Sequence, residues 1–134
     1  MIKRKHIDVN SRDTFVINSI HSSNVSDRVI GVIPVKSELV SVREAHATAG
    51  TDGSAVTLSI ERLQGTEAVG AGDAVVAATI DLKGAINTAQ SGTIVKTSNI
   101  HQFAAGDRVS VNVTGTTTAL ANMVVTCYFR PIDS

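Results

Sequence analysis

Residues 55–61 read AVTLSIE, and apolar and polar side chains alternate along this stretch. Val56, Leu58 and Ile60 fall on one face of an extended chain, and the polar residues between them fall on the other. Residues 108–114, RVSVNVT, alternate in the same way. A period of two over a stretch of this length predicts a β-strand with one buried face and one exposed face.

β-branched residues dominate the whole chain, which has 18 Val, 12 Ile and 14 Thr among its 134 residues but only 5 Leu. Branching at Cβ restricts χ1 and favours a strand over a helix. The chain is therefore predicted to be all-β. Six further stretches are predicted as strands: residues 14–20, 28–33, 38–47, 74–82, 93–97 and 123–130.

Turn-forming residues separate these stretches. Residues 50–53, GTDG, lie between two predicted strands and are typical of a hairpin tip. The tripeptide AGD occurs at residues 71–73 and 105–107, where glycine can supply a positive φ and aspartate can bind nearby backbone amides. Roughly seven to nine short strands at this spacing predict an antiparallel β-sandwich of jelly-roll type.

Charge divides the chain into two parts. The total of 12 basic and 12 acidic residues is neutral, which argues against a dedicated nucleic-acid-binding protein. Residues 1–12 nevertheless carry +3, because four basic residues outnumber one acidic residue, and residues 13–134 carry −3. We expect an extended N-terminal arm over residues 1–12 and a single β-sandwich domain over residues 13–134. The charged residues of the arm are Lys3, Arg4, Lys5 and Arg12 against Asp8.

Membrane insertion and disulfide bonding are not expected. No apolar run approaches the ~20 residues that a bilayer span requires. The first residues, MIKRKH, lack the apolar stretch of a signal peptide. Cys127 is the only cysteine, and it falls on the apolar face of the last predicted strand. It is predicted to be a small buried side chain and not a reactive thiol.

The sequence has no recognisable catalytic or metal-binding motif. It lacks the HExxH, GxSxG, P-loop and GxGxxG patterns. The four histidines, His6, His21, His46 and His101, are not at metal-ligand spacing, and they are predicted to be structural or solvated. We expect no catalytic residue, no metal within one chain and no cofactor. A metal at a symmetry axis, with one histidine from each subunit, stays open.

Aromatic side chains are scarce, with three Phe, one Tyr and no Trp. Phe15 and Phe129 fall on apolar faces and are predicted to lie in the core. Too few rings remain for the exposed platforms on which sugars or single-stranded nucleic acids stack.

Apolar side chains occur on both faces of the stretch at residues 38–47. Alternation places Val40 and Val42 on one face and Leu39 and Ala45 on the other. This pattern indicates that some outer faces of the domain are covered by a partner, since small β-branched side chains lose little entropy at an interface.

The order of these elements resembles small virion proteins of tailed bacteriophages. The resemblance rests on IGVIP at residues 30–34, the alternating stretch at 55–62, the two AGD tripeptides and the closing stretch at 124–131. It covers roughly residues 14–131. It implies a β-sandwich or jelly-roll module that trimerises, made in the host cytoplasm and placed on the capsid exterior as a decoration, or cement, protein.

The resemblance implies the major capsid protein as partner, without nucleic acid or membrane. We expect Lys3, Arg4, Lys5 and His6 of the arm to reach onto the shell or a neighbouring subunit. Loop residues are candidates for the opposite, exposed end: Thr51, Asp52, Gly53, Thr116, Thr117 and Thr118.

Two alternatives stay open at this point. One is a phage tail or fibre module that recognises a host surface glycan through the Thr-rich loop at residues 114–118. The other is a cellular sandwich adaptor or a small hydrolase, which would depend on His46 or His101.

Overall fold

The computed structural model describes residues 14–23, 25–51 and 53–133, which form ten strands and one short 3₁₀ helix. None of these residues belongs to a helix long and apolar enough to cross a membrane. The elements are β1 (Phe15–His21), β2 (Arg28–Val32), β3 (Ser37–Thr48), β4 (Thr57–Leu63), β5 (Asp73–Ala74), β6 (Ile80–Asp81), β7 (Gln90–Gly92), η1 (Thr97–Asn99), β8 (Gln102–Phe103), β9 (Arg108–Thr114) and β10 (Ala121–Pro131).

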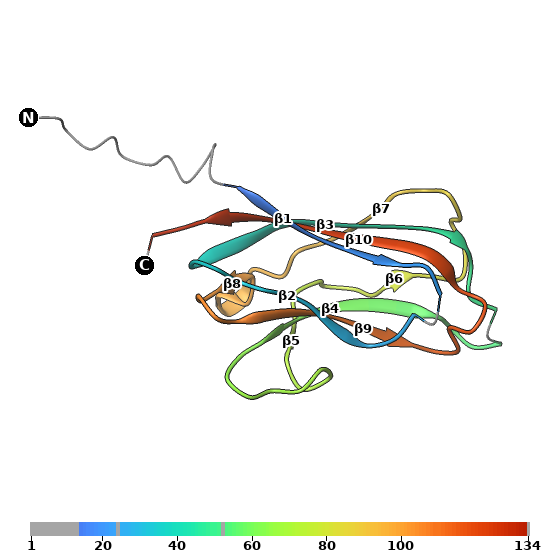
Figure 1. Ribbon diagram of the computed structural model, residues 1–134, viewed down its shortest axis with the longest axis horizontal. Helices are drawn as coiled ribbons and strands as arrows, with labels where there is room; N and C mark the ends of the chain where they lie inside the picture. The colour runs from blue at the N-terminus through green and yellow to red at the C-terminus, as the bar shows by residue number, and fades with distance from the viewer. Residues whose placement is uncertain (1–13, 24, 52, 134) are drawn as a thin grey trace, which may run out of the picture.

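The strands form two antiparallel sheets that face each other (Figure 1). Sheet A has the order β1-β10-β3-β7, and β8 pairs with another part of β3. Sheet B has the order β2-β9-β4-β5, and β6 also pairs with β4. Successive strands β1 to β4 alternate between the two sheets. Later in the chain, β9 pairs between β2 and β4 in sheet B, and β10 pairs between β1 and β3 in sheet A. This wrapped order is that of a jelly roll, so the predicted antiparallel β-sandwich is confirmed.

The core lies between the two sheets and is filled by the side chains that alternation predicts to point inward. Leu58 and Ile60 of β4 are completely buried. The aromatic centre of the core is Phe129 of β10. Its ring stacks on that of Phe15, in the paired strand β1, at a centroid distance of 5.3 Å. It forms a T-shaped pair with the ring of Phe103 at a centroid distance of 5.2 Å.

Cys127 points into the same core from β10. Its side chain is buried, and desolvation raises the pKa of the thiol to about 12. The thiolate that would react with other groups is therefore almost absent at neutral pH. The prediction of a buried, unreactive cysteine is confirmed.

β3 departs from strict alternation at Val40. The pairing of β3 with β10 shifts by one residue at this point. Leu39 and Val42 are both buried in the core, while Val40 is exposed beside the half-buried Ser41. The prediction that Val40 and Val42 share a face is wrong, because the bulge changes the phase of the alternation. Val40 and Ala45 instead lie on the outer face.

The stretch predicted as one strand over residues 74–82 contains two short strands. β5 and β6 pair with different ends of β4. Between them the chain leaves β4, and the Ala77 amide donates to the Thr93 carbonyl oxygen at 2.8 Å. The single-strand prediction is wrong because the chain changes its pairing partner here, and the adjacent Val75 and Val76 are both buried.

The prediction of a strand over residues 93–97 is also wrong. β7 ends earlier, at Gly92, and Ile94 makes only one isolated bridge, to Val76. The 3₁₀ helix η1 begins at Thr97. β-branched composition alone favoured a strand here, but this part of the chain has no continuous partner to extend it.

Residues 50–53 do not form a hairpin tip. They lie between β3 of sheet A and β4 of sheet B, so the chain crosses from one sheet to the other. The Gly50 amide donates to the carbonyl oxygen of Leu82 at 2.9 Å, and Leu82 belongs to a different loop. The hairpin prediction is wrong because glycine-rich turns serve both kinds of connection.

The two AGD tripeptides differ in structure. Gly106 has a φ of +89°, and the carboxylate of Asp107 accepts a hydrogen bond from the Ala104 amide at 2.8 Å, as predicted. Gly72 does not have a positive φ. It is required for another reason, since a Cβ at this position would lie 2.4 Å from the carbonyl oxygen of Arg62.

Candidate functional site

The basic arm predicted from the sequence lies outside the described residues. Lys3, Arg4, Lys5 and His6 all belong to it, so their role stays a prediction. Asp52 also lies outside the described residues, whereas its neighbours Thr51 and Gly53 are exposed.

The Thr-rich loop candidate lies at the same end of the sandwich as Thr51. Both loops are found at the end of the molecule opposite β8 and the C-terminus (Figure 1). They are in close contact, because a Cβ at Gly115 would lie 2.4 Å from the Ala55 carbonyl oxygen. Thr116 and Thr118 are exposed, but the hydroxyl of the half-buried Thr117 donates to the Val25 carbonyl oxygen at 2.7 Å.

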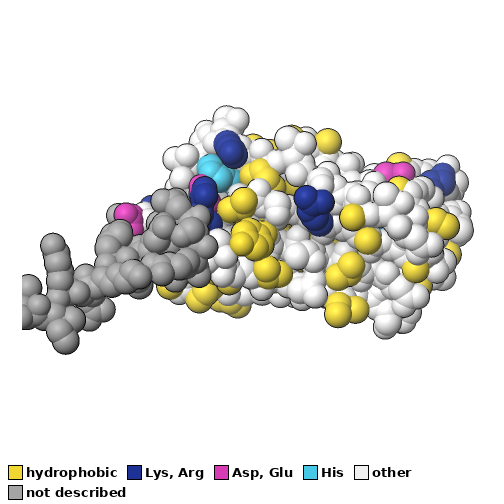
Figure 2. All heavy atoms as spheres, turned by 90° about the horizontal axis from the view of Figure 1, so that it is seen from above, with side chains coloured by type: hydrophobic (Ala, Val, Ile, Leu, Met, Phe, Trp, Pro, Cys, Tyr) yellow, Lys and Arg dark blue, Asp and Glu magenta, His cyan; other side chains and the backbone are white. Residues whose placement is uncertain are grey.

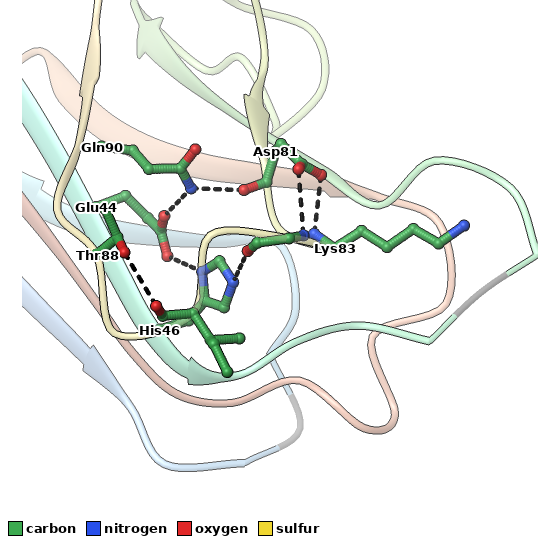
Figure 3. A network of polar contacts seen from close by, with 8 residues as sticks. Glu44, His46, Asp81, Lys83, Thr88 and Gln90 are labelled. Carbon is green, nitrogen blue, oxygen red and sulfur yellow. Dashed lines mark hydrogen bonds and ion pairs between the residues drawn. The ribbon is translucent and has the colours of Figure 1, made fainter.

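A buried polar network fastens the loop between β6 and β7 to sheet A at this end (Figure 3). His46 and Glu44 point inward from β3, and their side chains are completely buried. His46 Nδ1 lies 2.7 Å from Glu44 Oε2, and His46 Nε2 lies 2.7 Å from the Gly84 carbonyl oxygen. The amide of Gln90 donates to the other Glu44 oxygen at 2.8 Å and to the Asp81 carbonyl oxygen at 2.6 Å.

The chemistry of the acceptor fixes one proton position in this network. A carbonyl oxygen only accepts, so His46 Nε2 must donate to Gly84. The short contact between His46 Nδ1 and Glu44 must then contain a further proton, held by one partner or the other. The Glu44–His46 pair therefore holds Gly84 and the loop around it against β3.

Sequence reasoning missed this network. Its only local signal is that Glu44 and His46 are two residues apart in an alternating stretch, which places them on one face of a strand. The loop partner Gly84 is 38 residues further along the chain. Nothing in the sequence indicates that the buried side chains of Glu44 and His46 would contact the backbone of a residue so far along the chain.

The other described histidines lie in separate places. His101 Nε2 is 3.5 Å from a carboxylate oxygen of Glu38, which also pairs with Arg130. His21 Nε2 lies 2.6 Å from the Ser19 hydroxyl, and burial, followed by the charge of Arg28, lowers the pKa of His21.

The Ser19–His21 contact resembles a nucleophile and its base, but the buried Nδ1 of His21 has no hydrogen-bond partner to orient the ring. Within the described ranges, no three His, Cys, Asp or Glu side chains gather where they could hold a metal ion.

The outer face of sheet B is partly covered by the chain itself. Glu61 points outward from β4, yet it is only 4% exposed. The loop between β4 and β5 folds over it (Figure 1), and the carboxylate accepts hydrogen bonds from the amides of Gly70 at 2.8 Å and Gly72 at 3.2 Å. Asn112 of β9 adds a side-chain donor at 3.3 Å.

The outer face of sheet A is, in contrast, uncovered by the described residues (Figure 2). A polar row crosses the middle of this face, with Asn18, Thr126, Arg43 and Ser91 opposite one another on successive strands. The Thr126 hydroxyl donates to Asn18 Oδ1 at 2.9 Å. Arg43 is exposed, and its guanidinium makes no hydrogen bond or ion pair with another described residue.

Mainly apolar rows flank this polar row on both sides. Ile20 is 73% exposed, Val16 49% and Val40 42%, so large apolar side chains gather on one exposed face. Figure 2 shows hydrophobic side chains spread over the face, with a basic group near its middle and acidic groups toward its ends. One row contains Ile20, Val124 and Ala45, and the other contains Val16, Tyr128 and Ser41, with Val40 beside them.

The comparisons with known proteins show a similarity of fold. No protein-family model matches the sequence, and no curated protein matches it. A chain in the solved structure "Capsid of Ralstonia phage GP4" superposes on this one with a TM-score of 0.64 at 14% sequence identity. The superposition covers 98% of this chain and 93% of that one. The two chains therefore share the whole jelly-roll fold and have nearly the same length.

Proposed function

We propose that this chain is a structural protein of a tailed-phage virion, which decorates the capsid exterior and stabilises it by binding across shell subunits as a trimer. The observation that carries the proposal is the superposition, over almost the full length of both chains, on a chain from a phage capsid. The sequence resemblance to small virion proteins points independently to the same class.

The arrangement of polar groups supports a binding function and not a catalytic one. The buried carboxylates of Glu44 and Glu61 are each engaged in holding a loop. The described histidines lie apart from one another, and none of them contacts both a hydroxyl nucleophile and a carboxylate. A decoration protein needs no such group, because binding to the assembled shell stabilises that shell by mass action.

Binding to stripped shells tests the proposal. The protein is mixed with capsids of the virus that encodes it, after the chain has been removed from them, and sedimentation separates bound from free protein. We expect a trimer by light scattering, saturable rebinding and greater resistance of the rebound shells to heat. A monomer that ignores shells but binds whole host cells would contradict the proposal and assign the chain to a tail or fibre.

The same assay tests the predicted role of the N-terminal arm. Deleting residues 2–6 removes Lys3, Arg4 and Lys5, and it should leave the unfolding midpoint unchanged while weakening shell binding. The difference from wild type should be larger at low salt, because salt screens exposed charges over a Debye length of about 8–10 Å at 0.1–0.15 M. If the deletion protein binds shells as tightly as wild type at both low and high salt, a docking role for the arm is contradicted.

A further inference from the structure

Building on the proposed function, we propose that the outer face of sheet A is the surface that docks on the shell. We further propose that the shell presents to it an apolar protein surface carrying a carboxylate, which pairs with Arg43. The two halves of this proposal rest on different observations: the apolar rows and the unpaired guanidinium.

The apolar rows make this face suited to a protein partner. Ile20, Val16 and Val40 are largely exposed, although each is as apolar as the side chains of the core. They stand on strands that are fixed from behind by the buried core, so docking would cost little backbone entropy. Tyr128 adds an aromatic ring, and tyrosine is enriched in the buried centres of interfaces.

The two sheets differ in a way that points to sheet A. The outer face of sheet B receives the loop between β4 and β5, which is held there by Glu61. No described segment lies over the outer face of sheet A, and Ile20, Val16 and Val40 are exposed there. An exposed apolar patch of this kind is typical of a surface that binds a protein partner.

Arg43 specifies the charge of the partner. It lies in the middle row of the face, opposite Thr126 on one side and Ser91 on the other. Two other charged side chains of sheet A, Glu38 and Arg130, already form an ion pair with each other. Docking that desolvates Arg43 is favourable only if the partner supplies an anion, since an unpaired buried charge is costly.

A second copy of this chain complements the face poorly. Two copies packed face to face about an axis through the middle of the sheet would bring their Arg43 guanidinium groups together. Nearly every described carboxylate is already hydrogen-bonded or ion-paired within its own chain: Asp27, Glu38, Glu44, Glu61, Glu67, Asp73, Asp81 and Asp107, with Asp133 as the exception. The shell, and not another subunit, is therefore the occupant that charge complementarity favours.

The test compares charge reversal on this face with charge reversal elsewhere. Arg43→Glu is measured beside Lys96→Glu, which makes the same change in net charge at an exposed position outside the paired rows of this face. Ile20→Asp is measured beside Ile86→Asp, a matched change at an exposed isoleucine of the β6–β7 loop. Each variant is characterised by its unfolding midpoint, its mass by light scattering and its affinity for stripped shells.

We expect Arg43→Glu and Ile20→Asp to fold and assemble as wild type but to lose shell affinity by at least about 30-fold. Lys96→Glu and Ile86→Asp should bind as wild type. If both face variants bind shells normally, or if they change the oligomeric state and not the shell affinity, this docking assignment is overturned while the proposed function stands. If the wild-type chain itself fails to bind shells, the proposed function falls and takes the assignment with it.

Discussion

Replacing Phe129 with alanine is expected to lower the free energy of unfolding by about 3–5 kcal/mol. The ring is completely buried, and it joins the strand pair β1–β10 to β8 through its contacts with Phe15 and Phe103. Removing it leaves a cavity at the aromatic centre of the core and forfeits both ring contacts. Urea unfolding followed by circular dichroism measures the change.

Tyr128→Ala is the matched control for this prediction. It removes an aromatic side chain from the adjacent position of the same strand, but Tyr128 lies on the outer face and is 37% exposed. Its hydroxyl donates only to the Thr14 hydroxyl, at 2.8 Å. We expect a loss below about 1 kcal/mol. If Tyr128→Ala cost as much as Phe129→Ala, the register of β10 would be wrong by one residue.

The second large effect is expected at Glu61. Glu61→Ala should lower the free energy of unfolding by about 2–4 kcal/mol, because the donors that face the carboxylate would lose their acceptor. The amides of Gly70 and Gly72 are among these donors. We also expect amide hydrogen exchange to become faster within residues 64–72, the loop that folds over this side chain, while β9 and β10 keep their protection.

Glu67→Ala serves as the control at the exposed part of the same loop. Glu67 also accepts a backbone hydrogen bond, from the Gln64 amide at 2.7 Å, but this contact is exposed to solvent. The loss should stay within about 0.5 kcal/mol. Unchanged exchange in the loop of the Glu61→Ala protein would show that Glu61 does not hold it.

The sequence was sufficient to predict the fold class and the long strands. β1, β4, β9 and β10 lie within a few residues of their predicted positions, because each has one face on the core and therefore a regular alternation. Prediction was wrong where the chain changes partner or phase. The bulge at Val40 and the split of residues 74–82 depend on contacts with distant strands, which local periodicity does not contain.

The candidate site was less accessible to sequence reasoning. Apolar side chains on both faces of β3 predicted an outer face suited to a partner, which stays a prediction, and Val42, which was grouped with Val40, lies in the core. Arg43 was not singled out, because an arginine in a strand is ordinarily a solvated side chain. The role proposed for Arg43 depends on the pairing of three strands. This pairing puts Thr126 and Ser91 on either side of Arg43, and neither has an acidic side chain.

The central claim, that the chain decorates a phage capsid, is tested most directly by electron cryomicroscopy of particles of the virus that encodes it. Particles produced with the gene intact should carry density for a two-sheet jelly roll on the outer surface of the shell. This density should be absent from particles produced without the gene. Density of this shape found only in the tail, or shells identical in the two preparations, would contradict the account.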